Sequence, residues 1–127
     1  MKGFIENIEK LSLSNNNFRE VLYTGQHTQL VVMSLEPNED IGMEVHQIVD
    51  QFLRIEQGEG TVVIDNMERK IKDGDAIIIP AGIQHNIINT SDKEELKLYT
   101  LYSPPHHKDK TVHKTKSDAL KDESDHI

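Results

Sequence analysis

Short apolar runs alternate with turn-forming residues along the chain from Phe18 onward. The runs are rich in Val, Ile, Thr and Tyr, and clusters of Gly, Pro, Asn and Asp separate them. Runs of this length and composition are typical of β-strands, and the residues between them favour tight turns. Because no helical periodicity lies between the runs, we expect an all-β sandwich or barrel of antiparallel strands. The predicted strands are residues 20–24, 29–35, 44–46, 51–57, 61–64, 68–72, 76–80, 85–89 and 96–102.

The two ends of the chain follow other patterns. Apolar residues with helical spacing begin at Phe4 and end at Leu11, which predicts a short N-terminal helix broken from Ser12 onward. A pair of prolines from Pro104 stops the last strand, and the residues after it alternate charge without an apolar period. We therefore expect a solvated tail. The chain divides into a short N-terminal segment, one barrel domain and a polar tail, at residues 1–15, 16–103 and 104–127.

Composition narrows the classes of function. The 127 residues include 14 Lys and Arg against 22 Asp and Glu, which gives a formal net charge of −8. An acidic chain without a basic stripe predicts no nucleic-acid partner and no anionic membrane partner. No apolar run is long enough for a membrane span and no secretory signal pattern opens the sequence, so we expect a cytoplasmic protein. Since the chain has no cysteine, any metal must be held by His, carboxylate or amide groups.

Two stretches of the chain resemble the two motifs of the cupin family. Residues 74–89, GDAIIIPAGIQHNIIN, run from a glycine turn through a strand and a Pro-x-Gly turn to a strand that opens on His85, and they match every fixed position of the second motif. Residues 42–58, GMEVHQIVDQFLRIEQG, resemble the first motif with substitutions. From Asn7 through Tyr102 the chain is similar to small single-domain bacterial cupins, some of them loosely described as mannose-6-phosphate isomerase-like. The resemblance implies an antiparallel double-stranded β-helix, or jelly-roll barrel.

The resemblance also implies a metal site. In cupins the first motif supplies His, His and Glu, and the second supplies one more His, to one ion inside the barrel. Counting back from Gly58 assigns Gln51 to the glutamate position and leaves the two histidine positions to Glu44 and His46. Two imidazoles, a carboxylate and an amide oxygen suit one divalent transition metal ion, whether Fe, Mn, Zn or Ni. The implied ligand set is Glu44, His46, Gln51 and His85.

Neither the reaction nor the presence of the metal follows from the resemblance, since cupin barrels host isomerases, oxygenases, lyases and non-enzymatic binders. One hypothesis is a mononuclear metalloenzyme of isomerase or dioxygenase type that acts on a small polar molecule. The alternative is a non-catalytic barrel that binds a small molecule or a metal, and the two ligand substitutions are also what a barrel that has lost its metal would show. A third hypothesis is a structural dimer module, because such barrels pair across subunits and the family implies a homodimer.

The other polar residues near the motifs have structural interpretations. By strand parity with Gln51, we expect Asp50 and Arg54 to point away from the ligands. Tyr99 and Tyr102 are expected to pack, although one of them can reach the pocket as a hydrogen-bond donor.

The remaining histidines and the isoleucine run have the following interpretations. The tail histidines are expected to be solvated, with residues 111–113 as the segment able to fold back on the barrel mouth. His27 is expected to be structural or exposed, and the run Ile77 to Ile79 predicts a strand buried on both faces. The tail histidines are His106, His107, His113 and His126.

Overall fold

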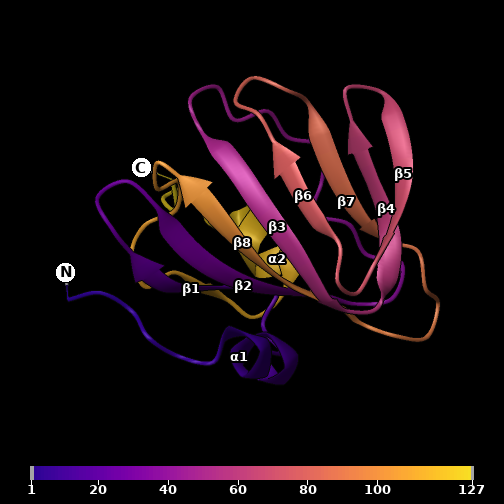
Figure 1. The fold of residues 1–127 in the computed structure, drawn as a ribbon, viewed down its shortest axis with the longest axis horizontal. Coiled ribbons are helices and arrows are strands. Elements are labelled where there is room, and N and C mark those ends of the chain that lie inside the picture. The colour runs from indigo at the N-terminus through magenta and orange to yellow at the C-terminus, as the bar shows by residue number, and fades with distance from the viewer. Residues whose placement is uncertain (1, 127) are drawn as a thin grey trace.

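Nine strands form two antiparallel sheets in residues 2–126, the part of the chain that this computed structural model describes (Figure 1). The six-stranded sheet has the order β6-β3-β8-β2-β1-β9, and the three-stranded sheet has the order β5-β4-β7. This arrangement confirms the all-β, antiparallel jelly-roll class. The strands are β1 (Arg19–Thr24), β2 (Gln29–Leu35), β3 (Asp50–Gln57), β4 (Glu59–Ile64), β5 (Met67–Lys72), β6 (Ala76–Ile79), β7 (His85–Asn89), β8 (Leu96–Ser103) and β9 (Val112–His113).

Eight of the nine predicted strands are present, with ends that differ by at most two residues. The predicted strand at residues 44–46 is wrong, because there only Glu44 pairs, in an isolated bridge with His85. Gly42, with φ of 110°, takes the chain out of the extended conformation just before this segment.

The N-terminal helix both begins and ends later than predicted, since Ser12 and Ser14 lie within it. Helix α1 spans Ile8–Ser14, because the Asn7 side chain caps it by accepting a hydrogen bond from Lys10 N at 2.9 Å. No helix among residues 2–126 has the length and apolar character needed to cross a membrane.

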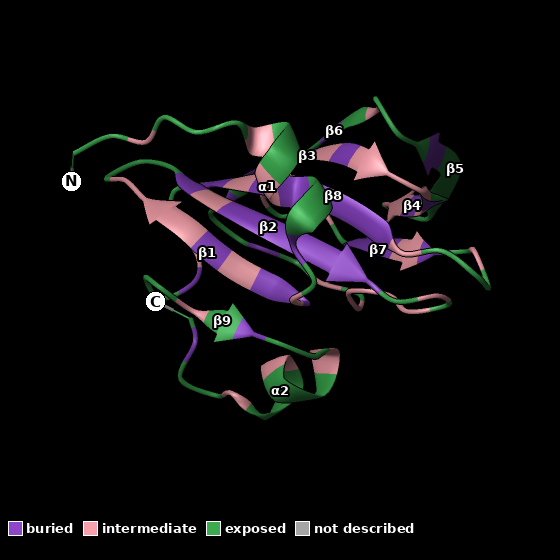
Figure 2. Ribbon diagram, turned by 90° about the horizontal axis from the view of Figure 1, so that it is seen from below, coloured by how far each residue is buried: buried purple, intermediate pink, exposed green. Residues whose placement is uncertain are grey.

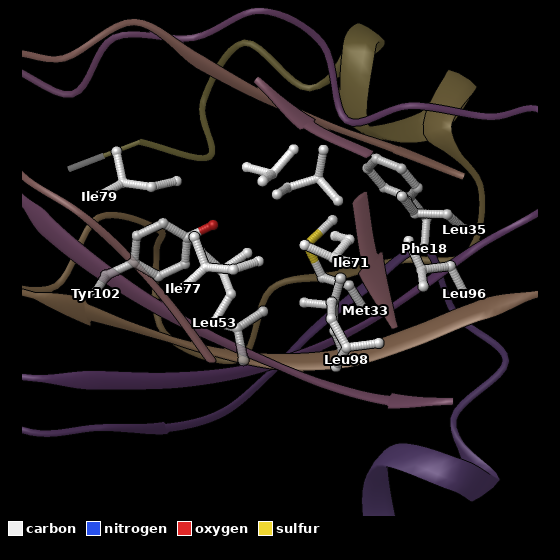
Figure 3. Close-up of a cluster of buried hydrophobic side chains, with 14 of the residues drawn as sticks. Phe18, Met33, Leu35, Leu53, Ile71, Ile77, Ile79, Leu96, Leu98 and Tyr102 are labelled. Carbon is white, nitrogen blue, oxygen red and sulfur yellow. The ribbon is translucent and has the colours of Figure 1, made fainter. Parts of the chain in front are cut away.

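The interior of the barrel is filled by alternate residues of the strands. In β3 the residues that point inward are Gln51, Leu53 and Ile55, and all three are buried. Figure 3 shows the apolar cluster, with Ile79 and Tyr102 at one end and Leu35 and Leu96 at the other. Gln51 pairs with Ile79 on one side and with Tyr102 on the other. The polar Gln51 therefore lies at the Tyr102 end of the barrel.

The run from Ile77 to Ile79 lies in β6, and the expectation that this strand is buried on both faces is wrong. Ile77 and Ile79 are buried, whereas Ile78 is 69% exposed. The reason is that β6 is an edge strand of the six-stranded sheet and its outer face points to solvent.

The expectation of a solvated tail is also wrong. Strand β9 pairs antiparallel with β1, so residues 111–113 do fold back, and helix α2 (Lys116–Lys121) follows. Figure 2 shows β9 and α2 beside β1, with α1 on the opposite side of the sheet. His107 and His113 are buried, and each pairs with a tail carboxylate, at 2.7 Å to Asp125 and 3.0 Å to Asp122 respectively. Polar residues can be buried here because they are buried in pairs.

Two glycines with positive φ allow a test of the close approach between the β3–β4 turn and the residue that precedes β8. A Cβ on Gly58 (φ 96°) would lie 2.6 Å from the carbonyl oxygen of Glu95, whereas a Cβ on Gly74 (φ 91°) would meet nothing within 4 Å. We expect Gly74→Ala to lower the free energy of unfolding by about 1–2 kcal/mol, from positive φ alone. We expect Gly58→Ala to lower the free energy of unfolding by the same amount and by about 1–3 kcal/mol more, because its methyl group would also overlap the Glu95 carbonyl. Urea unfolding followed by circular dichroism measures both losses, and equal losses would contradict the close contact.

Candidate functional site

Backbone hydrogen bonds bring the two motif segments together. Glu44 and His85 exchange both of their backbone bonds, at 2.8 and 2.9 Å, although a regular strand is absent on the Glu44 side. Two residues further on, the carbonyl of His46 accepts a bond from Gly82 N at 2.8 Å. Residues of the first motif are thereby fixed against the first residue of β7, and their side chains point to the same place.

Three of the four predicted ligands form one cluster. One ligand atom from each of Glu44, His46 and His85 lies within 4.8 Å of the other two. The imidazole rings of His46 and His85 are 5.1 Å apart, and His46 Nε2 lies 3.2 Å from Glu44 Oε2. Both histidines are buried and Glu44 is partly exposed. Glu44 and His46 thus lie together, as strand parity predicts, even though the segment is not a regular strand.

Gln51 approaches from the barrel wall with its carbonyl oxygen free. Its Nε2 donates to Thr100 Oγ1 at 3.0 Å, and the Thr100 hydroxyl donates to the carbonyl of Phe52 at 2.9 Å. Because the only hydroxyl proton of Thr100 is engaged with Phe52, Thr100 acts as the acceptor toward Gln51. The amide nitrogen of Gln51 must therefore face Thr100, which leaves Oε1 without a partner among the described residues.

Unpartnered buried atoms are concentrated in the predicted ligand set. Across residues 2–126, seven buried side-chain nitrogen or oxygen atoms make no well-formed hydrogen bond, and three of them are His46 Nε2, Gln51 Oε1 and His85 Nε2. Of these three, only His46 Nε2 has a charged neighbour in this part of the chain, the Glu44 carboxylate at 3.2 Å. Buried polar atoms in native proteins are almost always satisfied, so such a concentration needs an explanation. In His85, Nδ1 donates to the carbonyl of Ile83 at 2.9 Å, which leaves the Nε2 lone pair free. This is how metal-binding histidines are commonly oriented.

The protonation states of Glu44 and His85 suit the binding of a metal cation. Burial opposes the charge on Glu44, but the contact with His46 and the positive charge of Arg19 outweigh it, so the pKa of Glu44 is lowered overall. In His85, by contrast, burial itself lowers the pKa, because it disfavours the charged imidazolium. A carboxylate and a neutral imidazole are the forms that ligate metals.

The interpretations of Asp50, Arg54 and His27 are confirmed. Asp50 is exposed and accepts a hydrogen bond from Ala81 N at 2.9 Å. Arg54 points outward and lies 3.5 Å from a carboxylate oxygen of Glu56. His27 is exposed.

Two residues cover the site: Tyr102, which was expected from the sequence to be able to reach the pocket, and His106, for which the expectation of a solvated side chain is wrong. The His106 ring lies 4.3 Å from the His46 ring, and Tyr102, which is 2% exposed, lies 5.9 Å from it. Burial and the neighbouring imidazoles lower the pKa of His106 to about 3, and burial raises the pKa of Tyr102, so both side chains are neutral at pH 7. One sequence signal was available, since His106 follows the Pro104-Pro105 pair at the end of β8, which is the end where Gln51 lies.

A cavity of about 230 Å³ opens beside the cluster. Its walls include Arg19 and Glu44 from the barrel and Lys116, Asp125 and His126 from the tail. The volume is smaller than that of a typical drug-sized pocket, so the space suits a small molecule or ion.

Two features define the class of barrel protein to which this chain belongs. One is the small antiparallel jelly-roll, and the other is the group of two buried histidines and a carboxylate at one end of it. Residues 31–102 match the family model described as Cupin domain, and the chain belongs to the cupin family.

Similar proteins extend the match beyond those residues. YrkC, an uncharacterized protein of Bacillus subtilis (strain 168), is 50% identical over 125 residues, which is 94% of this chain and 67% of YrkC. The uncharacterized protein L612 of Acanthamoeba polyphaga mimivirus is 44% identical over 82% of this chain and 67% of its own length. The crystal structure of BH2720 from Bacillus halodurans superposes with a TM-score of 0.92 at 44% identity, over 95% of this chain and 96% of that one.

Proposed function

We propose that this cupin is a mononuclear metalloprotein whose barrel acts on a small polar molecule. The observation that carries the proposal is a pair of unpartnered buried atoms, Gln51 Oε1 and His85 Nε2, beside a buried His46 imidazole whose Nε2 lies 3.2 Å from the Glu44 carboxylate. A divalent ion would satisfy all of them at once, whereas an apolar pocket would leave them unpaired. The proposed ligands are Glu44, His46, Gln51 and His85.

The donor set favours a transition metal. Two imidazoles, one carboxylate and one amide oxygen suit Fe(II), Mn(II), Zn(II) or Ni(II), and they leave coordination positions for water or substrate. When bound, such an ion supplies Lewis acid chemistry or activates oxygen, which corresponds to reactions of isomerase or dioxygenase type.

The chain's own residues restrict the substrate. The cavity beside Glu44 is small, and four carboxylates line it together with two cations. The carboxylates are Glu44, Asp122, Glu123 and Asp125, and the cations are Arg19 and Lys116. This mixture of charges favours a small polar molecule over a highly anionic one. Tyr102 stays protonated because burial raises its pKa, so its role is to donate a hydrogen bond or to pack and not to act as a base.

The second candidate function is non-catalytic binding of a small molecule or a metal, and the position of the tail over the cluster favours it. The His106 ring packs on the His46 ring at 4.3 Å, so the tail covers the mouth over the cluster. Small carbonyl and hydroxyl compounds screened against the metal-loaded protein separate the two functions. Turnover that depends on bound metal and is lost in His85→Ala supports the metalloenzyme, whereas saturable binding without turnover supports the binder.

The Gln51 position gives a prediction of its own. We expect Gln51→Glu to raise the affinity for Mn(II) about tenfold relative to Zn(II), because a second carboxylate makes the site harder and more negative. Competition titrations of metal-stripped protein measure this preference. The matched control is Gln47→Glu, which adds the same charge at a nearby exposed position. If both variants shift the preference equally, or neither does, Gln51 is not a ligand.

A further inference from the structure

A second histidine cluster lies in the tail, outside the proposed ligand set. One ligand atom from each of His106, His107 and His126 lies within 4.8 Å of the others. The three ring-to-ring distances are 4.8, 4.6 and 5.5 Å. His107 and His126 are opposed in an isolated antiparallel bridge, and opposed residues of such a bridge carry their side chains on the same face. The backbone thus fixes two of the three rings relative to each other.

His107 is oriented like a metal ligand. It is 2% exposed, and its Nδ1 lies 2.7 Å from Asp125 Oδ2, so the ring donates its proton to a carboxylate. The Thr111 hydroxyl lies 3.1 Å from Asp125 Oδ1 and shares its one proton between this oxygen and the carbonyl of Lys108, which is closer, at 2.7 Å. The opposite nitrogen, Nε2, is buried and has no hydrogen-bond partner within residues 2–126. A histidine whose second nitrogen donates to a carboxylate is the usual arrangement at a metal.

We propose that His106, His107 and His126 form a second metal site, which binds a divalent cation of the zinc type. Three neutral imidazoles with an open fourth position form an established zinc coordination set. The His126 side chain is 58% exposed and lines the same cavity as Glu44, which gives an ion a route into the site. The two sites share no residue, although the rings of His46 and His106 are in contact.

A zinc ion in this site would fasten the tail. His106 and His107 follow the end of β8, whereas His126 lies close to the C-terminus, so one ion would close the loop between them. Since the unfolded chain lacks this geometry, zinc binding stabilises the folded tail in proportion to its affinity. Zinc should therefore protect the tail from proteolysis, which is a readout independent of any catalytic activity.

The test is a zinc titration of the metal-stripped full chain, with bound zinc counted after gel filtration. We expect two equivalents for the wild-type protein and one for His126→Ala, in which the tail affinity falls at least about 100-fold. Because His126 is exposed, this variant should fold normally. The matched control is His27→Ala, an exposed histidine outside both clusters, which should keep two equivalents.

The first site is tested separately with His85→Ala. This variant should keep one equivalent and the zinc-dependent protection of the tail, and combination with His126→Ala should remove both. If His85→Ala binds as much zinc as the wild type while His126→Ala loses one equivalent, the first site fails and the tail site stands. The tail site is overturned if His126→Ala keeps the stoichiometry, the affinity and the protease protection of the wild-type protein.

Discussion

Replacing His85 with alanine is expected to remove one equivalent of transition metal and to leave a folded barrel. His85 contributes a free Nε2 that is held in place by the bond from Nδ1 to the carbonyl of Ile83. Removal of a residue that only orients a ligand already lowers metal affinity by about 10- to 100-fold, so loss of the ligand itself should cost at least the upper figure. Elemental analysis of protein purified without chelator measures the loss.

Folding of this variant is expected to survive because the structural role of residue 85 lies in its backbone. The two bonds exchanged with Glu44 involve only main-chain atoms, which alanine retains. Circular dichroism and a urea unfolding curve check this, and we expect a loss of about 1–3 kcal/mol, as for other buried substitutions. The matched control is His27→Ala, which is exposed and should change neither metal content nor stability. Undiminished metal in a folded His85→Ala variant would contradict the ligand assignment.

The Asp125→Ala variant is expected to lose about 3–5 kcal/mol of unfolding free energy, because it breaks a buried pair of polar groups. Asp125 is 3% exposed and accepts a hydrogen bond from His107 at 2.7 Å. It also lies 3.1 Å from the Thr111 hydroxyl, which donates to the carbonyl of Lys108 as well. Its removal leaves a buried imidazole N–H without an acceptor, and it also removes the negative charge that faces Arg19.

The comparison for this variant is Asp122→Ala. Asp122 also pairs with a buried histidine, His113, at 3.0 Å, but its own side chain is 34% exposed. Water can replace such a carboxylate, so the loss should be clearly smaller. Urea unfolding of both variants in the presence of chelator measures the difference without any contribution from metal. Equal losses of unfolding free energy in the two variants would mean that the burial of Asp125 does not contribute to the stability of the tail.

The β-strands could be predicted from the sequence because their signal is local. In β7 and β8, for example, an apolar run with turn residues at each end is enough to locate the strand within a residue. The proximity of Glu44, His46 and His85 could be expected from the resemblance to the two cupin motifs, with the register set by Gly58, whereas their role as ligands stays a prediction. The exposure of Ile78 could not, since its sequence neighbours are both buried and only the edge position of β6 explains it.

The tail could not be predicted because its order depends on pairs that are distant in sequence. Arg19 of β1 contacts His113 at 3.3 Å, and His107 contacts Asp125 eighteen residues later. Charged residues that are buried as pairs leave no apolar period, so composition alone indicated solvent exposure. One local signal was present, since Thr115 is followed three residues later by Asp118, and the Thr115 side chain does cap α2.

The most direct test of the metal centre is a crystal structure of the protein with an anomalous difference map recorded at the absorption edge of the bound metal. We expect a peak at coordination distance, roughly 2.0–2.3 Å, from His46 Nε2, His85 Nε2 and an oxygen of Glu44, with Gln51 Oε1 as the fourth protein ligand. A metal-loaded crystal with no peak among these residues, or with a peak only at the tail histidines, would contradict the proposed centre.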